Sequence, residues 1–190
     1  MIRDLILKNR SYRRFYGDVS ITKKQLLEWV DLARISPSAA NRQPLKFKLS
    51  NSEPTNTRIF NCLAWAGYIK EWKGPEEEER PSAYIVVLAD TEISKSYFDA
   101  DYGIAAQSML LGAVESGYGG CILAGIDRNQ LRSALSISDQ YEVLAVIALG
   151  KPKEEVVLED IGSDGDIKYW RDAQMVHHVP KRLLDELVIG

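Results

Sequence analysis

The stretch from Asp99 to Ser116, DADYGIAAQSMLLGAVES, is the most apolar helical segment of the chain. Its apolar side chains cover most of the circumference of a helix: Ile104, Ala105, Ala106, Met109, Leu110 and Ala113. A helix that is apolar nearly all round is a buried helix. Gly117 is expected to end it, because glycine readily adopts the backbone conformation of a helix C-terminus. We therefore expect a buried central helix at the middle of the fold.

Strands are expected both before and after this helix in the sequence. The segment 83–89, AYIVVLA, is apolar on both faces and is typical of a central strand. Leu45, Phe47 and Leu49 alternate with polar residues, which predicts a half-exposed strand. Two more strands are expected at 121–124 and 141–149. The pattern predicts an α+β fold in one domain, residues 1–190, with a small mixed sheet flanked by helices.

Shorter helices are indicated by their capping residues. Thr22 and Gln25 have the spacing of a capping box, and the apolar residues that follow recur on one helical face: Leu26, Leu27, Val30 and Ala33. Asp127 with Gln130 predicts the start of a helix that runs to Leu135. A further helix is expected over 55–72.

The overall composition excludes several classes of function. The chain has 190 residues and a net charge of −3, which argues against a nucleic-acid partner. Its longest apolar run is too short to span a membrane, and charged residues interrupt the first turns where a leader would be apolar. Cys62 and Cys121 are isolated, which predicts buried, reduced thiols in a cytoplasmic protein. The two histidines, His177 and His178, are adjacent, so neither a metal site nor a catalytic triad is expected.

Two segments could bind a ligand. Arg10, Ser11, Arg13 and Arg14 cluster near the N-terminus, and guanidinium groups offer forked donors to a phosphate. Taken alone, such a cluster is more often a solvated basic turn. The segment 36–44, SPSAANRQP, combines small residues with amides that could match the polar edge of a heterocycle such as a flavin, although its composition is also that of an ordinary loop.

No set of residues supplies obvious acid–base or nucleophilic catalysis. A basic cluster, a polar loop of small residues and a buried helix nevertheless occur together. This combination is typical of a protein whose cofactor carries the chemistry.

The chain resembles the nitroreductase family of flavin enzymes in five blocks that follow the family's order. Residues 9–13, NRSYR, resemble its R-R-S-x-R opening, and residues 36–44 resemble its A-P-S-A-x-N-x-Q-P-W loop. Residues 101–107 match the start of its long central helix, and residues 117–125 match its G-x-G-x-C strand. Residues 179–186 resemble the basic segment that ends its chains. Asn9 and Leu45 depart from the family's arginine and tryptophan.

The resemblance implies that the cofactor is FMN and assigns residues to it. Arg10 and Ser11 would hold the phosphate together with Lys181, or with Arg182 as the alternative. Arg13 would reach the pyrimidine edge of the flavin and stabilise its reduced form. The remaining residues implied to contact the ring are Pro37, Ser38, Ala39, Asn41 or Gln43, and the main chain of Ile122, Leu123 and Ala124.

The resemblance also implies a homodimer with the flavin at the subunit interface. The tail, residues 153–190, ends on apolar residues and would wrap the partner. The implied reaction passes hydride from NADH or NADPH through the flavin to an electron-poor small molecule, either a nitroaromatic compound or a quinone. Two alternatives remain open on this scaffold: a reductive dehalogenase or enone reductase, and a non-catalytic flavin-binding protein. The segment 67–80 matches no family pattern, and its role is left open.

Overall fold

The central helix is α4, Phe98–Glu115, in a computed structural model that describes residues 1–96 and 98–190. It packs against α2, Lys23–Arg34, and against one face of the larger sheet. The prediction of a buried helix is confirmed for Ala105, Ala106, Met109, Leu110 and Ala113. Ile104 is an exception, because it is 40% exposed.

The larger sheet has the strand order β1-β5-β3-β2, and β4 also pairs with β5. The strands are β1 Phe15–Tyr16, β2 Leu45–Ser50, β3 Ala83–Asp90, β4 Gly119–Leu123 and β5 Tyr141–Pro152. All of these pairings are antiparallel, and an isolated parallel bridge joins Ser11 to Gly120 at the edge of β4. Strand β3 is buried at every residue, as its sequence predicts.

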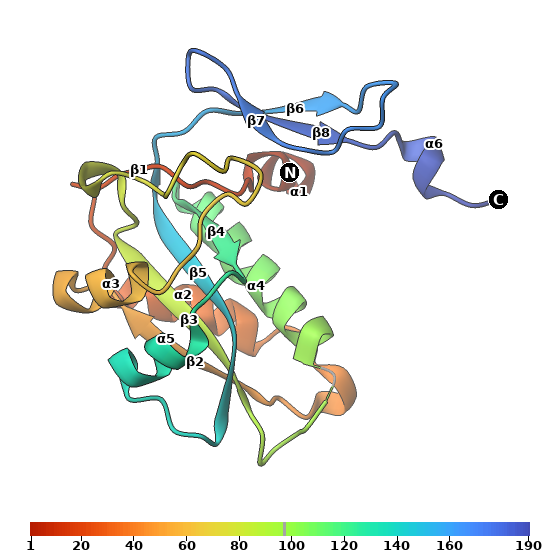
Figure 1. Ribbon diagram of the computed structural model, residues 1–190. Coiled ribbons are helices and arrows are strands. Elements are labelled where there is room, and N and C mark those ends of the chain that lie inside the picture. The colour runs from red at the N-terminus through yellow and green to blue at the C-terminus, as the bar shows by residue number, and fades with distance from the viewer. Residues whose placement is uncertain (97) are drawn as a thin grey trace.

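Helices cover both faces of this sheet (Figure 1). Alternate residues of β3 enter two separate cores, since Ile85 packs with α2 and α4 whereas Val86 packs with the other face. That other face is covered by α3, Glu53–Phe60, and α5, Arg128–Leu135. Two 3-10 turns, Ala39–Asn41 and Glu77–Glu79, lie in loops. Cys62 and Cys121 are buried and form no disulfide, as expected.

The predicted capping residues begin α2 and α5. The Thr22 hydroxyl accepts a hydrogen bond from the Gln25 amide, and the Asp127 carboxylate accepts one from the Gln130 amide. Leu27 was expected on the buried face of α2 but is exposed, because only Leu26 and Trp29 of this helix are fully covered.

The helix expected over 55–72 is confirmed only for its first part, because α3 ends at Phe60. Leu63 instead bridges Ile126, and the Ala64 amide donates to the Gly125 carbonyl at 2.8 Å. These bonds to the chain beyond β4 replace the helical ones. Residues 64–76 consequently form an irregular segment in which Ala66 and Gly74 have positive φ.

The tail forms a second, three-stranded sheet that the sequence did not reveal. Strand β8, His177–Lys181, pairs in parallel with β6, Val156–Asp160, and antiparallel with β7, Trp170–Arg171. Figure 1 shows this sheet beside α1, Ile2–Lys8, and shows α6, Leu184–Leu187, extending away from the rest of the chain. The last apolar residues of the chain are exposed: Leu184, Leu187, Val188 and Ile189. None of the helices in the described ranges is both long enough and apolar enough to cross a bilayer.

His178 joins the strands of this second sheet. Its Nδ1 lies 3.2 Å from the Glu159 carboxylate and its Nε2 lies 3.3 Å from the Asp172 carboxylate. Its ring stacks on Trp170 with centroids 4.1 Å apart. Desolvation alone would lower the pKa of His178, but the bonds to Asp172 and Glu159 outweigh it and raise the pKa. The protonated ring therefore bonds to both β6 and the turn after β7.

We predict that the second sheet is more stable in mildly acidic than in alkaline solution. Because the folded pKa of His178 is raised, its stabilisation is complete below about pH 6.5, the ordinary histidine value, and is lost as the pH rises through the folded value. Amide hydrogen exchange of β6 and β8, corrected for the intrinsic rate, should be faster at about pH 8.5 than at about pH 5.5. The variant His178→Gln should lose this difference, and equal protection of the native protein at both pH values would contradict the prediction.

Candidate functional site

The N-terminal segment and the second sheet enclose a cavity that we call the basic pocket. It has a volume of about 270 Å³. It is lined by Asn9, Arg10, Ser11, Arg13, Val156, Tyr169, His177, Val179 and Lys181. The fold therefore brings the predicted residues at the two ends of the chain to one place.

Three cationic side chains reach the basic pocket. Arg10 is anchored through its Nη2, which donates to the Ile6 carbonyl at 2.5 Å near the end of α1. Lys181 lines the pocket from the last residue of β8. Arg182, the alternative phosphate residue, does not line it and lies 3.5 Å from the Glu186 carboxylate. The charges of Arg10, Arg13 and Lys181 give the basic pocket a positive potential.

Arg13 is the most deeply buried of these cations, with 9% of its surface exposed. Its backbone amide donates to the Glu154 carboxylate at 2.8 Å, and its Nη1 donates to the Ser11 carbonyl at 3.1 Å. Its guanidinium carbon lies 4.8 Å from the centre of the Tyr169 ring. The Glu154 carboxylate also accepts two bonds from Arg171, at 3.0 and 2.6 Å.

His177 lies against Arg13 and is 1% exposed. The Arg13 Nη1 is 3.4 Å from the His177 Nε2, and because a guanidinium can only donate, this ring nitrogen accepts. Burial lowers the pKa of His177 to about 4, assisted by the charges of Arg13, Arg171 and His178. His177 is therefore neutral near pH 7 and adds no charge to the basic pocket.

Several buried nitrogens of this pocket are unsatisfied. Within residues 1–96 and 98–190, the Arg10 Nε, the Arg13 Nε and the His177 Nδ1 have no hydrogen-bond partner. Buried polar atoms are normally paired. The His177 Nδ1 faces the Glu154 carboxylate at 3.8 Å, whereas the two arginine Nε atoms face no acceptor within the described residues and indicate a ligand that accepts hydrogen bonds. Guanidinium and ammonium donors suit a phosphate ester. The residues present therefore fit the phosphate-bearing part of FMN.

Strand β4 begins at the edge of the basic pocket. The Tyr12 amide donates to the Gly120 carbonyl at 3.1 Å, next to the Ser11–Gly120 bridge. A Cβ on Gly120 would lie 2.4 Å from the Ala148 carbonyl oxygen, so only glycine allows this close packing. Ile122 and Ala124 follow with exposed side chains and Leu123 with a buried one. The segment 122–124, which the family resemblance places against the flavin ring, therefore starts two residues after Gly120 of this bridge.

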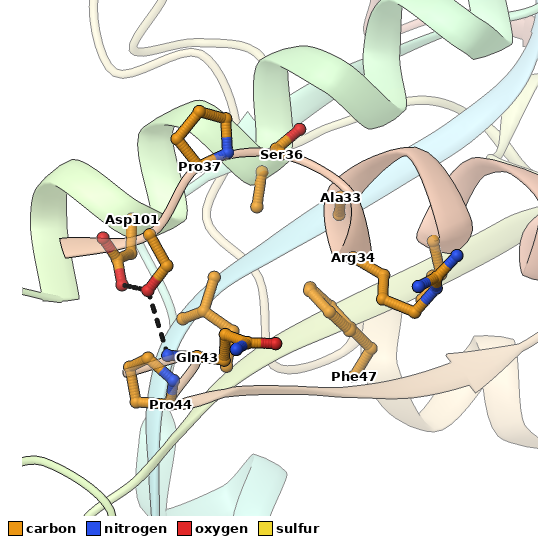
Figure 2. Close-up of a pocket in the computed structure, with 12 residues that line it drawn as sticks. Ala33, Arg34, Ser36, Pro37, Gln43, Pro44, Phe47 and Asp101 are labelled. Atoms are coloured by element: carbon orange, nitrogen blue, oxygen red, sulfur yellow. Dashed lines mark hydrogen bonds between the residues drawn. The ribbon is translucent and has the colours of Figure 1, made fainter. Parts of the chain in front are cut away.

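The loop 36–44 lines a different cavity, which we call the loop pocket. It also has a volume of about 270 Å³ and is mainly apolar. It is lined by Val30, Ala33, Arg34, Ser36, Pro37, Ser38, Gln43, Pro44, Leu45, Phe47, Asp101 and Ala105. Figure 2 shows Asp101 beside Pro37 on one side of this cavity and Gln43 with Pro44 on another. Ala39 and Asn41 are exposed and do not line it.

Asp101 at the start of α4 organises the loop. Its carboxylate accepts a bond of 2.6 Å from the Ser38 hydroxyl and one of 2.7 Å from the Ala39 amide. The Ser38 hydroxyl in turn accepts from the Gln43 amide at 3.0 Å, shown as a dashed line in Figure 2. Ala40, Asn41 and Gln43 have φ between 50° and 53°, a left-handed conformation that costs each about 1–3 kcal/mol. The buried Asp101 therefore holds a strained loop in one shape.

The two pockets are separate within one chain, because they share no lining residue. The loop pocket meets α4 at Asp101 near its start, whereas Asn9 of the basic pocket bonds Gln107 of α4 at 3.2 Å. Six residues correspond to about 240° of rotation around a helix, so these two contacts lie on different sides of α4. One chain therefore does not gather all of the predicted flavin residues around a single cavity.

Sequence reasoning missed four residues of the basic pocket and its support: Glu154, Tyr169, Arg171 and His177. The signal available was the alternation of a strand, which sends His177 and His178 to opposite faces. In the structure, His177 faces Arg13 and His178 faces Glu159 and Asp172.

Comparisons with known proteins agree with this architecture. A family model described as "Nitroreductase family" matches residues 6–151. A protein of Archaeoglobus fulgidus named "Putative NADH dehydrogenase/NAD(P)H nitroreductase" is 28% identical, over 80% of this chain and 85% of its own length.

Solved structures show the same similarity. A nitroreductase family protein from Clostridium novyi NT is 27% identical, with a TM-score of 0.66 over 80% of this chain and 87% of that one. An FMN-dependent nitroreductase from Clostridium difficile R20291 is 25% identical, with a TM-score of 0.66 over 82% of this chain and 89% of that one.

Proposed function

Because this chain belongs to the nitroreductase family, we propose that it passes hydride from NADH or NADPH through FMN to an electron-poor small molecule, a nitroaromatic compound or a quinone. The chain is an NAD(P)H-dependent flavin oxidoreductase, and its cofactor is FMN. The observation that supports this function best is the basic pocket, where buried arginine nitrogens without partners in the described residues surround one cavity.

The roles of individual residues follow from their positions in the basic pocket. When bound, FMN supplies the chemistry by accepting a hydride at its ring and passing it on. Arg10, Ser11 and Lys181 would hold the phosphate, because they line the cavity with exposed or half-buried polar groups. Arg13 would lie at the pyrimidine edge, where a fixed positive charge favours the electron-rich form of the ring. The edge of β4 at 122–124 would face the other side of the ring.

A second copy of the chain would complete the site. The loop 36–44 cannot share a cavity with the basic pocket of its own chain, so we propose that Pro37, Ser38, Ala39, Asn41 and Gln43 cover the flavin bound by the partner. The exposed apolar residues of the tail and Ile104 of α4 support this homodimer, since large apolar patches are rarely left in water. Residues 1–190 would form one domain whose tail, about 153–190, wraps the partner.

An anaerobic titration tests the proposed reaction. The purified protein should contain or take up FMN, and NADH or NADPH should bleach the flavin absorbance. Nitroaromatic compounds and quinones should then restore the absorbance rapidly in a stopped-flow experiment, whereas halogenated or enone acceptors should do so slowly. A protein that takes up no FMN would refute the function, and fast reoxidation by only one halogenated compound or enone would favour the reductase alternatives.

Arg10→Ala and Arg13→Ala should have different effects. Arg10→Ala removes a phosphate contact and should weaken FMN binding by about 10- to 100-fold, the effect of one charge-assisted hydrogen bond. Arg13→Ala removes the charge beside the ring and should lower the flavin reduction potential. Fluorescence titration measures the first quantity and dye equilibration the second. Equal losses of affinity with an unchanged potential would contradict the division of roles.

The apolar tail predicts a change of oligomeric state on mutation. Leu187→Asp places a charge on an exposed apolar residue of α6 and should shift the protein from dimer to monomer, with loss of FMN binding. Light scattering after size-exclusion chromatography measures the mass. Asp185→Asn, on the same short helix, is the control and should stay dimeric. A Leu187→Asp variant that remains dimeric and binds FMN normally would rule out this role of the tail.

A further inference from the structure

The Arg13 guanidinium is a buried charge without a carboxylate partner in the part of the chain that the structure describes. Glu154, the nearest buried acid, accepts from the Arg13 backbone amide and otherwise bonds to Arg171. The guanidinium itself contacts the Ser11 carbonyl, the Tyr169 ring and the His177 ring nitrogen. A buried charge without a counter-ion is costly, so its place must be fixed by these neutral groups and its charge met by a ligand.

His177, from strand β8, and Tyr169, the residue before β7, hold the guanidinium. The Tyr169 ring presents its face to Arg13, a cation–π contact that is strongest when water is excluded. The His177 ring lies 5.1 Å from the Tyr169 ring and accepts a bond from Arg13. Because His177 is neutral near pH 7, it holds the guanidinium without repelling it. The Arg13 Nε remains without a partner among the described residues.

We propose that Tyr169 and His177 are positioning residues for Arg13, holding its guanidinium by a ring face and a ring nitrogen so that its remaining donors point at the anionic cofactor. This inference rests on the proposed function, since it assumes that Arg13 acts on bound FMN. It assigns the second sheet a role in the site besides supplying Lys181.

The irregular segment 67–74 contacts Tyr169 and also Arg171, the partner of Glu154. The Tyr68 ring lies 4.9 Å from the Tyr169 ring, and the Tyr169 hydroxyl accepts a bond of 3.4 Å from the Tyr68 amide. The Arg171 guanidinium lies 4.0 Å from the Trp72 ring and bonds to Glu154. The segment whose sequence matched no family pattern therefore packs on the residues that fix Arg13.

The test compares three variants of neighbouring aromatic residues. Tyr169→Leu removes the ring face and should weaken FMN binding about tenfold, between the effects of an exposed and a desolvated cation–π contact, and lower the reduction potential. Tyr169→Phe keeps the ring face and should resemble the native protein. Trp170→Leu is the matched control, because Trp170 follows Tyr169 directly in the chain but stacks on His178 and not on Arg13. The thermal midpoint of each protein without FMN measures damage to the second sheet.

A double-mutant cycle decides whether Tyr169 acts through Arg13. In the Arg13→Ala background, Tyr169→Leu should change neither FMN affinity nor potential further. An undiminished effect in that background would overturn the proposal, because Tyr169 would then contact the cofactor itself. An effect of Tyr169→Leu no larger than that of Trp170→Leu would also overturn it. A native protein that binds no FMN would instead refute the proposed function.

His177 provides a second test if Tyr169→Leu lowers the thermal midpoint strongly. His177→Leu removes the acceptor for Arg13 and should lower the reduction potential, whereas His177→Gln keeps an acceptor and should restore much of it. The same cycle with Arg13→Ala applies. Equal potentials for His177→Leu, His177→Gln and the native protein would exclude the positioning role of His177.

Discussion

Glu154 is a fully buried carboxylate that joins the two ends of the chain. It accepts the Arg13 amide from the N-terminal segment and two donors of Arg171 from the second sheet. Its side chain has no exposed surface, so removing either partner would leave an unsatisfied charge in a water-free place. The basic pocket exists because these bonds hold the N-terminal segment against strands β7 and β8.

The pocket is thus built outside the main hydrophobic cores. The cores lie on the two faces of β3 and are covered by helices, whereas the residues that meet the cofactor lie on a loop, a sheet edge and a small sheet. This division lets the cores carry stability while charged groups collect at one edge. It also leaves the loop 36–44 on another side of α4, which is why a single chain holds only part of the proposed site.

Local patterns predicted the elements that depend on near neighbours. The caps at Thr22 and Asp127 and the buried strand β3 were found, since each is set by residues a few positions apart. The prediction of a helix over 55–72 does not hold beyond Phe60, because Leu63 and Ala64 bond to the chain after β4 and not to the preceding helical turn. Those partners are more than sixty residues away in sequence, and no local pattern contains them.

By itself, the sequence determined the α+β class, the central helix and the family, because apolar spacing and short ordered motifs are local features. It also marked Arg10, Ser11, Arg13 and Lys181 as candidates for one anion. Only the tertiary structure decided that Arg13 meets Glu154 and His177, which are 141 and 164 residues away. It also decided that His177 faces the pocket and His178 does not. Contacts between distant segments depend on how whole sheets pack, and this packing determines which buried groups find partners.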